Sequence, residues 1–121
     1  MDQTVACWDL NSDGQTDAGS QGFLAVSAGG LHSCGIQANN QLICWGSDAY
    51  GQGLPTIETA KIVSAGAGHT CAIGMDDGAE CWGKNDKGQS NATDVPLRAI
   101  SAGLDHTCGI TLAGQTTCWG Q

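Results

Sequence analysis

The residues that could do chemistry in this chain are mainly cysteines and histidines, and they recur at a fixed interval of 37 residues. Three histidines, His32, His69 and His106, each precede a cysteine by two positions. Ten residues after each of those cysteines comes a Cys-Trp dipeptide. With a fourth copy near the start of the chain, the dipeptides are Cys7-Trp8, Cys44-Trp45, Cys81-Trp82 and Cys118-Trp119. A period of this size is typical of a repeat architecture, so we expect function to reside in the array and not in one unique pocket.

The ten-residue interval between cysteines predicts a disulfide across a β-hairpin. The segment Gly74-Met75-Asp76-Asp77-Gly78 has the composition of a turn, because glycine permits positive φ and aspartate bonds its own backbone. Folding the chain about this turn places Cys71 opposite Cys81, where β-carbons lie about 4.5–5.5 Å apart and a disulfide can form. Each such bridge should stabilise the fold by roughly 2–3 kcal/mol. The predicted disulfides are Cys34–Cys44, Cys71–Cys81 and Cys108–Cys118.

The seventh cysteine, Cys7, has no partner in this scheme, because the position ten residues upstream would precede the first residue. Two interpretations stay open. Cys7 is either a free or locally buried thiol, or it bonds a cysteine of another chain or one exposed at an end of the array.

An acidic loop near the start of the chain is a candidate calcium site. Calcium prefers oxygen ligands at alternate positions of a loop with glycine at the sixth place, and residues 9–17 follow that pattern with Gly14 at the sixth. Position 12 of the loop is Ser20, where a bidentate carboxylate would be expected. The alternative is an acidic loop between strands. The candidate ligands are Asp9, Asn11, Asp13, Gln15 and Asp17.

No constellation in the sequence predicts catalysis. A zinc site built from one histidine and two cysteines of a repeat would lack a fourth ligand, and the paired cysteines favour a disulfide instead. We therefore expect each histidine to be structural and to bond a neighbouring backbone. The periodic tryptophans indicate packing between repeats more than stacking on sugars. Asn91 begins the tripeptide Asn-Ala-Thr and is a candidate glycosylation site in a secreted protein.

The repeats divide one domain, residues 1–121, into units of the same pattern. Each unit opens with Ser-Ala-Gly, continues with His-Ser/Thr-Cys, and reaches Cys-Trp-Gly after a turn. Two units are complete, at 27–63 and 64–100, and partial units precede and follow them at 1–26 and 101–121. No segment shows a sustained apolar period near 3.6, so the sequence predicts an all-β fold.

This pattern resembles the regulator of chromosome condensation repeat, in particular its cysteine-bearing variety in bacterial secreted and surface proteins. The resemblance covers nearly the whole chain and implies that each repeat contributes to one blade of a β-propeller. Propellers typically need 4–8 blades to close, whereas this chain supplies three hairpins and part of a fourth unit. The resemblance therefore implies an incomplete ring.

The composition excludes several classes of function. Four Lys+Arg against twelve Asp+Glu give a net charge of −8, which opposes binding to nucleic acid or to anionic membranes. No apolar run is long enough for a transmembrane helix. Seven cysteines in hairpin-compatible positions favour an oxidising, extracellular location.

Together these features predict a non-enzymatic extracellular module that associates with copies of itself through incomplete terminal blades. Unpaired blade edges must be covered, and another copy could cover them in a closed ring or in a filament. One alternative is a lectin or protein inhibitor that binds a glycan or another extracellular protein through loops such as 47–50 and 84–87. A second alternative is a fragment of a longer propeller.

Overall fold

The computed structural model describes residues 23–46, 57–92 and 95–120. These residues form three antiparallel sheets of three strands each, in the order of the chain. The strands are β1 (Phe23–Ala28), β2 (His32–Gln37), β3 (Leu42–Gly46), β4 (Ile62–Ala65), β5 (His69–Ile73), β6 (Ala79–Gly83), β7 (Leu97–Ala102), β8 (His106–Thr111) and β9 (Thr116–Gly120). We call β1–β3 the first blade, β4–β6 the second blade and β7–β9 the third blade.

The hairpin at the centre of each blade is set by its turn. In the second blade the amide of Gly74 donates to the carbonyl of Gly78 at 2.9 Å, and Asp76 Oδ1 accepts from the Gly78 amide at 3.0 Å. Asp77 adopts a φ of 71°, a left-handed conformation that aspartate tolerates better than most residues. The turn fixes the register of β5 on β6, so that Cys71 faces Cys81.

Each blade contains one disulfide across its hairpin. The bonds join Cys34 to Cys44, Cys71 to Cys81 and Cys108 to Cys118, with Cα–Cα separations of 4.0, 4.1 and 4.0 Å. Equivalent residues therefore occupy equivalent places in all three blades. This arrangement confirms the predicted all-β fold with hairpin disulfides.

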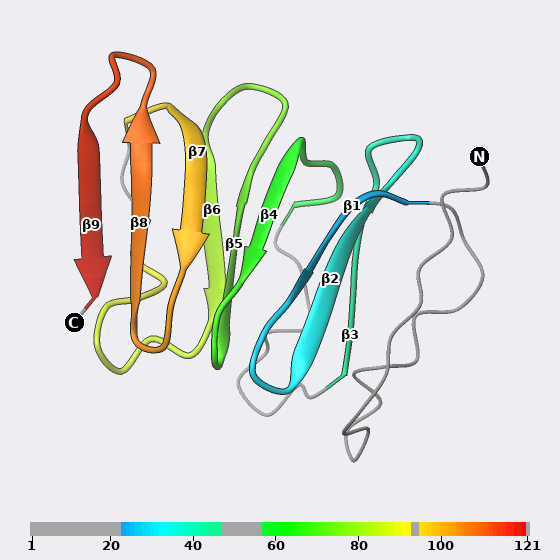
Figure 1. Cartoon of the computed structure of the whole chain (residues 1–121), viewed down its shortest axis with the longest axis horizontal. Helices are drawn as coiled ribbons and strands as arrows, with labels where there is room; N and C mark the ends of the chain where they lie inside the picture. Colours follow the sequence, from blue (N-terminus) through cyan, green and yellow to red (C-terminus); the bar gives the residue numbers. More distant parts are fainter. Residues whose placement is uncertain (1–22, 47–56, 93–94, 121) are drawn as a thin grey trace.

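The three blades stand side by side like part of a fan, with the third blade at one end and the first at the other (Figure 1). The first strands of the blades lie next to one another, since β4 contacts both β1 and β7. In the described part of the chain there is no helix of the length and hydrophobicity needed to span a bilayer.

The hydrophobic core lies between blades, not within one. Ile36 and Leu42 of the first blade pack in one cluster with Ala72, Trp82 and Val63 of the second blade. A three-stranded sheet alone has no second layer against which to bury its apolar face, so each blade relies on its neighbour for burial. The contact between blades is therefore the feature on which the core of each blade depends.

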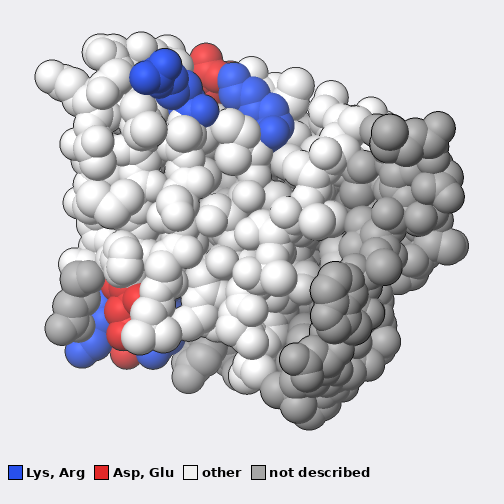
Figure 2. Space-filling model, viewed as in Figure 1, with Lys and Arg blue, Asp and Glu red and all other residues white. Residues whose placement is uncertain are grey.

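Charged side chains are few and gather at the two ends of the blades, while the middle of the face shown in Figure 2 is uncharged. At one end Lys61 pairs with Asp77. At another, Lys84 Nζ lies 3.5 Å from Asp105 and 3.7 Å from Asp86. Exposed pairs of this kind contribute little to stability, so charge does not hold the blades together.

Candidate functional site

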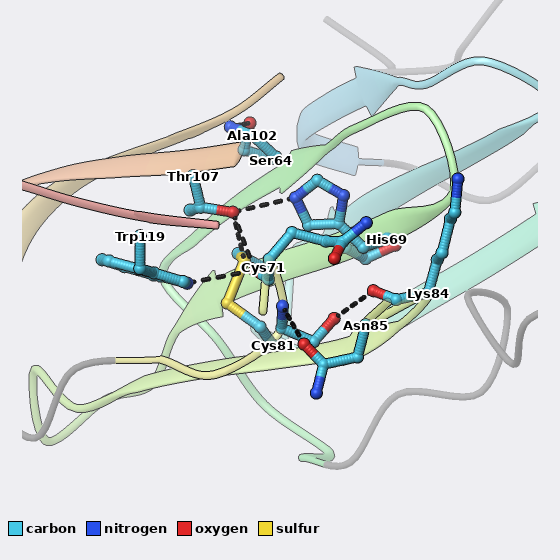
Figure 3. The surroundings of a disulfide bond; sticks show 12 residues. Ser64, His69, Cys71, Cys81, Lys84, Asn85, Ala102, Thr107 and Trp119 are labelled. Atoms are coloured by element: carbon cyan, nitrogen blue, oxygen red, sulfur yellow. Dashed lines mark hydrogen bonds between the residues drawn. A yellow bond between two sulfur atoms is a disulfide. The ribbon is translucent and has the colours of Figure 1, made fainter. Parts of the chain in front are cut away.

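The histidine of each repeat bonds a hydroxyl of the next blade. His69 Nε2 lies 2.8 Å from Thr107 Oγ1, and both side chains point toward each other from facing sheets (Figure 3). Thr107 donates its own proton to the carbonyl of Gln89 at 3.0 Å. Because a hydroxyl has only one proton to give, His69 must be the donor to Thr107 through Nε2–H. In the neutral ring this leaves Nδ1 as the nitrogen without a proton.

Burial keeps His69 in this neutral form. The side chain is fully buried, and Nδ1 has no hydrogen-bond partner among the described residues. Protonation would place a charge and an unpaired N–H in that buried position. Burial accordingly lowers the pKa of His69 below its ordinary value, although the backbone of His106 and the charge of Asp105 act in the opposite direction.

The same contact recurs one blade earlier. His32 Nε2 lies 2.7 Å from Thr70 Oγ1, and the sulfur of Cys34 lies 4.0 Å from that hydroxyl. In the next interface the sulfur of Cys71 lies 3.6 Å from Thr107 Oγ1. The hydroxyls of Thr70 and Thr107 thus each meet both the histidine and the disulfide of the preceding blade.

The Ser-Ala-Gly segment supplies a second set of bonds between blades. Ser27 Oγ accepts from the Ala65 amide, and Ser64 Oγ accepts from the Ala102 amide, both at 2.9 Å. Two backbone bonds run alongside: the Gly30 amide donates to the carbonyl of Gly66 at 3.0 Å, and the Ala67 amide donates to that of Gly103 at 3.2 Å. Each blade therefore uses the serine and an amide near its first turn to hold the next blade.

Gly66 of this segment explains why glycine recurs there. A Cβ at this position would lie 2.5 Å from the carbonyl oxygen of Gly103 and 2.6 Å from the ring of His69. No side chain fits such distances, so only glycine lets the two blades approach this closely.

Trp119 reaches back to the preceding repeat. Its Nε1 donates to the carbonyl of Gln89 at 3.0 Å, the same oxygen that accepts from Thr107. The side chain of Gln89 is fully buried; its Oε1 accepts from the Lys87 amide and its Nε2 donates to Asp86. This contact of Trp119 is one between repeats, as the periodic tryptophans indicated.

The outward face of the third blade has the same groups but no blade against it within the described residues. His106 is exposed, whereas His32 and His69 are 1% and 0% exposed. Ile110 is partly exposed at the position where Ile36 and Ile73 are 1% and 0% exposed. The face forms an open hollow lined by Ala99, Ile100, Ser101, Cys108, Gly109, Ile110 and Thr116. We call this surface the open face, and it is the candidate functional site.

Several residues singled out in the sequence lie elsewhere. Cys7 and the calcium-type loop from Asp9 to Asp17 fall outside the described residues, so calcium binding stays a prediction. Asn91 is exposed, and its Oδ1 accepts from Asn85 Nδ2 at 2.9 Å. No group of three or more histidine, cysteine or acidic side chains in the described ranges is placed to hold a metal ion.

The hydroxyl that meets each histidine was missed by sequence reasoning, which expected a backbone partner for the ring. The signal was present, because a serine or threonine follows the histidine in every repeat. Its meaning depends on which blade that hydroxyl faces. In β8 the consecutive side chains of His106 and Thr107 point to opposite faces of the strand, so Thr107 meets His69 of the preceding blade while His106 lies on the other side.

Comparison with known proteins supports the same architecture. Residues 23–52 match the regulator of chromosome condensation (RCC1) repeat. The chain is similar to the CRINKLY WD40 ectodomain of the Arabidopsis thaliana receptor kinase ACR4, with 30% identity and a TM-score of 0.85 over 98% of this chain and 44% of that one. It is also similar to the ectodomain of the Physcomitrella patens receptor kinase CR4, with 32% identity and a TM-score of 0.83 over 99% of this chain and 34% of that one.

Yeast RCC1 (Prp20), solved bound to Kap60, has the same fold at 15% identity, with a TM-score of 0.79 over 93% of this chain and 38% of that one. No curated protein sequence matches this chain closely enough to count as a relative. The fold and contacts define a partial β-propeller. Its units are regulator of chromosome condensation-type repeats with one disulfide per blade, and the chain spans less than half the length of the structures it matches.

Proposed function

We propose that this chain is a non-enzymatic, extracellular protein-interaction module that associates with copies of itself through blade surfaces left uncovered. One observation carries the proposal. The open face presents at the end of the described array the same histidine, serine and isoleucine that are covered by a neighbouring blade in the first and second blades.

The physical argument rests on what uncovered blades expose. A face built for packing leaves apolar surface in water, and covering that surface gains hydrophobic free energy. Its polar groups exchange bonds to water for bonds to the partner at a small net gain. Another copy can cover it because every copy is built from the same blade. A contact between two different surfaces of identical chains then either closes into a ring or continues as a filament.

The extracellular part of the proposal rests on the disulfides and on two relatives. Three disulfides in a chain of 121 residues favour an oxidising compartment. The receptor kinase structures that the chain resembles are ectodomains by description. A role in protein interaction agrees with the yeast RCC1 structure, which is a complex with Kap60.

Sedimentation velocity across a concentration series tests the proposal. We expect the apparent mass to exceed that of a 12.3 kDa monomer and to rise with concentration, with the disulfides intact. A monomer at every concentration up to the solubility limit would contradict self-association. Addition of EDTA in a parallel series separates this association from any contribution of the calcium-type loop.

A second candidate is that the chain is part of a longer propeller, favoured by its coverage of only 44% and 34% of the two receptor structures. The open face would then receive the next blade of the same polypeptide. The length of the natural polypeptide separates the two interpretations. Mass spectrometry of the protein isolated from its source should give about the 12.3 kDa of this chain if the chain stands alone, and a larger mass with further repeats in the same phase if it is part of a longer propeller.

A further inference from the structure

We propose that the open face binds the β1 edge of a second copy, so that copies join head to tail. This inference rests on the proposed self-association and names the two surfaces and the contacts. One surface is the outward face of the third blade, and the other is the side of β1 that faces away from the second blade.

The surface on the third blade is defined by the contacts made one blade earlier. Ser64 accepts the amide of Ala102, and the Ala67 amide donates to Gly103. The residues equivalent to Ser64 and Ala67 in the third blade are Ser101 and Leu104. Ser101 is exposed and lines the hollow, and Leu104 is 70% exposed. These groups offer an acceptor and an amide donor at fixed positions, and no blade within residues 23–46, 57–92 and 95–120 meets them.

The surface on β1 carries the complementary residues. In the second blade Val63 packs against the cluster that contains Ile36, and Ala65 is only 7% exposed. The residues equivalent to Val63 and Ala65 in β1 are Val26, which is 51% exposed, and Ala28, which is also exposed. Because the same repeat positions are covered in β4 and exposed in β1, β1 presents a second blade surface that no blade among the described residues covers.

Placing one surface on the other restores the contacts of an internal interface. Shifting each internal contact by one repeat sets Ile110 against Val26 and brings the Ala28 amide to Ser101 Oγ. The same shift brings the Leu104 amide to the carbonyl of Gly29. None of these residues carries a charge, so the net charge of −8 does not act directly at this contact.

Single variants on each surface test the proposal. Ile110→Lys places an ammonium group in the hollow, and Val26→Glu places a carboxylate on β1. Burying either charge without a partner should weaken association about 100-fold, seen as a monomer by sedimentation velocity. Met75→Lys is the matched control, because Met75 is 55% exposed at a hairpin turn and should leave association unchanged. Far-UV circular dichroism checks that each variant folds, and Thr116→Glu replaces Ile110→Lys should that variant not fold.

Mixing the two variants gives the decisive result. The Val26→Glu chain keeps an intact open face and the Ile110→Lys chain keeps an intact β1, so an equimolar mixture should form a 1:1 dimer that does not grow further. Association of both single variants like the unsubstituted chain would overturn this inference and leave the proposed self-association standing. Loss of association in only one of the two variants, or no dimer on mixing them, would also overturn this inference. A monomeric unsubstituted chain would overturn the proposed function itself.

Discussion

The second and third blades share one repeat pattern and one strand register, yet their outward faces have opposite surroundings. In the second blade His69 is fully buried and bonds Thr107 of the next blade. In the third blade the equivalent His106 is exposed. The difference shows that burial in this fold is not a property of the repeat itself. It is supplied by the neighbour, so the same residues are structural inside the array and available for binding at its end.

The largest expected loss of stability in both blades comes from removing their disulfides. Each bond joins residues ten positions apart, so constraint of the unfolded chain should contribute about 2–3 kcal/mol in both. Cys71 is also fully buried against Thr107, whereas the equivalent Cys108 is only partly buried. Replacing Cys71 and Cys81 by alanine should therefore destabilise the chain by roughly 1 kcal/mol more than the same change in the third blade, because it also leaves a cavity. Urea unfolding of the two double variants measures this, and equal losses would mean that burial adds nothing.

Replacing the glycine of the Ser-Ala-Gly segment should cause the next largest loss of stability, and a different loss in the second and third blades. Gly66→Ala sets a Cβ against the backbone of Gly103, which can move only if the blades separate, so we expect a loss of about 2–3 kcal/mol. Gly103→Ala meets the ring of His106, at 2.5 Å, and that exposed ring can rotate away. Its loss should stay below about 1 kcal/mol. Thermal unfolding of both variants decides the point, and a milder effect of Gly66→Ala would show that the blade contact is more adaptable than these distances indicate.

Removing the histidines should have a smaller effect of the same kind. His69→Ala leaves a cavity and deprives Thr107 of its donor, for an expected loss of about 2 kcal/mol. His106→Ala should change the stability of the monomer by less than about 0.5 kcal/mol, since the exposed side chain packs against no further blade among the described residues. Both are measured by urea unfolding at low protein concentration. Similar losses in the two variants would mean that His106 is already covered in solution.

Acidification should weaken the interface between the second and third blades by a smaller amount. The pKa of His69 is lowered in the folded chain, so the unfolded chain binds the extra proton first. The free energy of unfolding should therefore be constant above about pH 6.5 and fall as the pH decreases toward the folded pKa, by at most about 1.4 kcal/mol per pH unit. His69→Gln, which keeps a donor but does not titrate, should lose this part of the pH dependence. An unchanged pH profile in His69→Gln would show that the neutral ring is not what stabilises the interface.

Much of this fold could be predicted from the sequence because the repeat makes each inference three times over. The ten-residue spacing and the turn at Gly74–Gly78 in the sequence indicated the hairpin, the register and the disulfides that the structure has. These are local features, decided by turn chemistry within one unit.

The contacts between blades could not be predicted in the same way. Thr107 is close in sequence to His106, but it bonds His69 of the preceding blade and the carbonyl of Gln89. Hydrogen bonds of this kind depend on which face of each strand lies against which neighbouring blade. The 37-residue period alone does not determine that. The open face was anticipated only as an incomplete ring, and its residues emerged from comparing equivalent positions in three blades.

The series of hydrogen bonds around Thr107 gives the array a direction. His69 donates forward to the next blade, while Thr107 and Trp119 donate backward to Gln89, so the two sides of a blade are chemically different. An array assembled from such blades has a plus end and a minus end, as a cytoskeletal polymer does. Subunits could add in only one orientation, and a single capping chain that matches one end would stop growth there while leaving the other end free to extend.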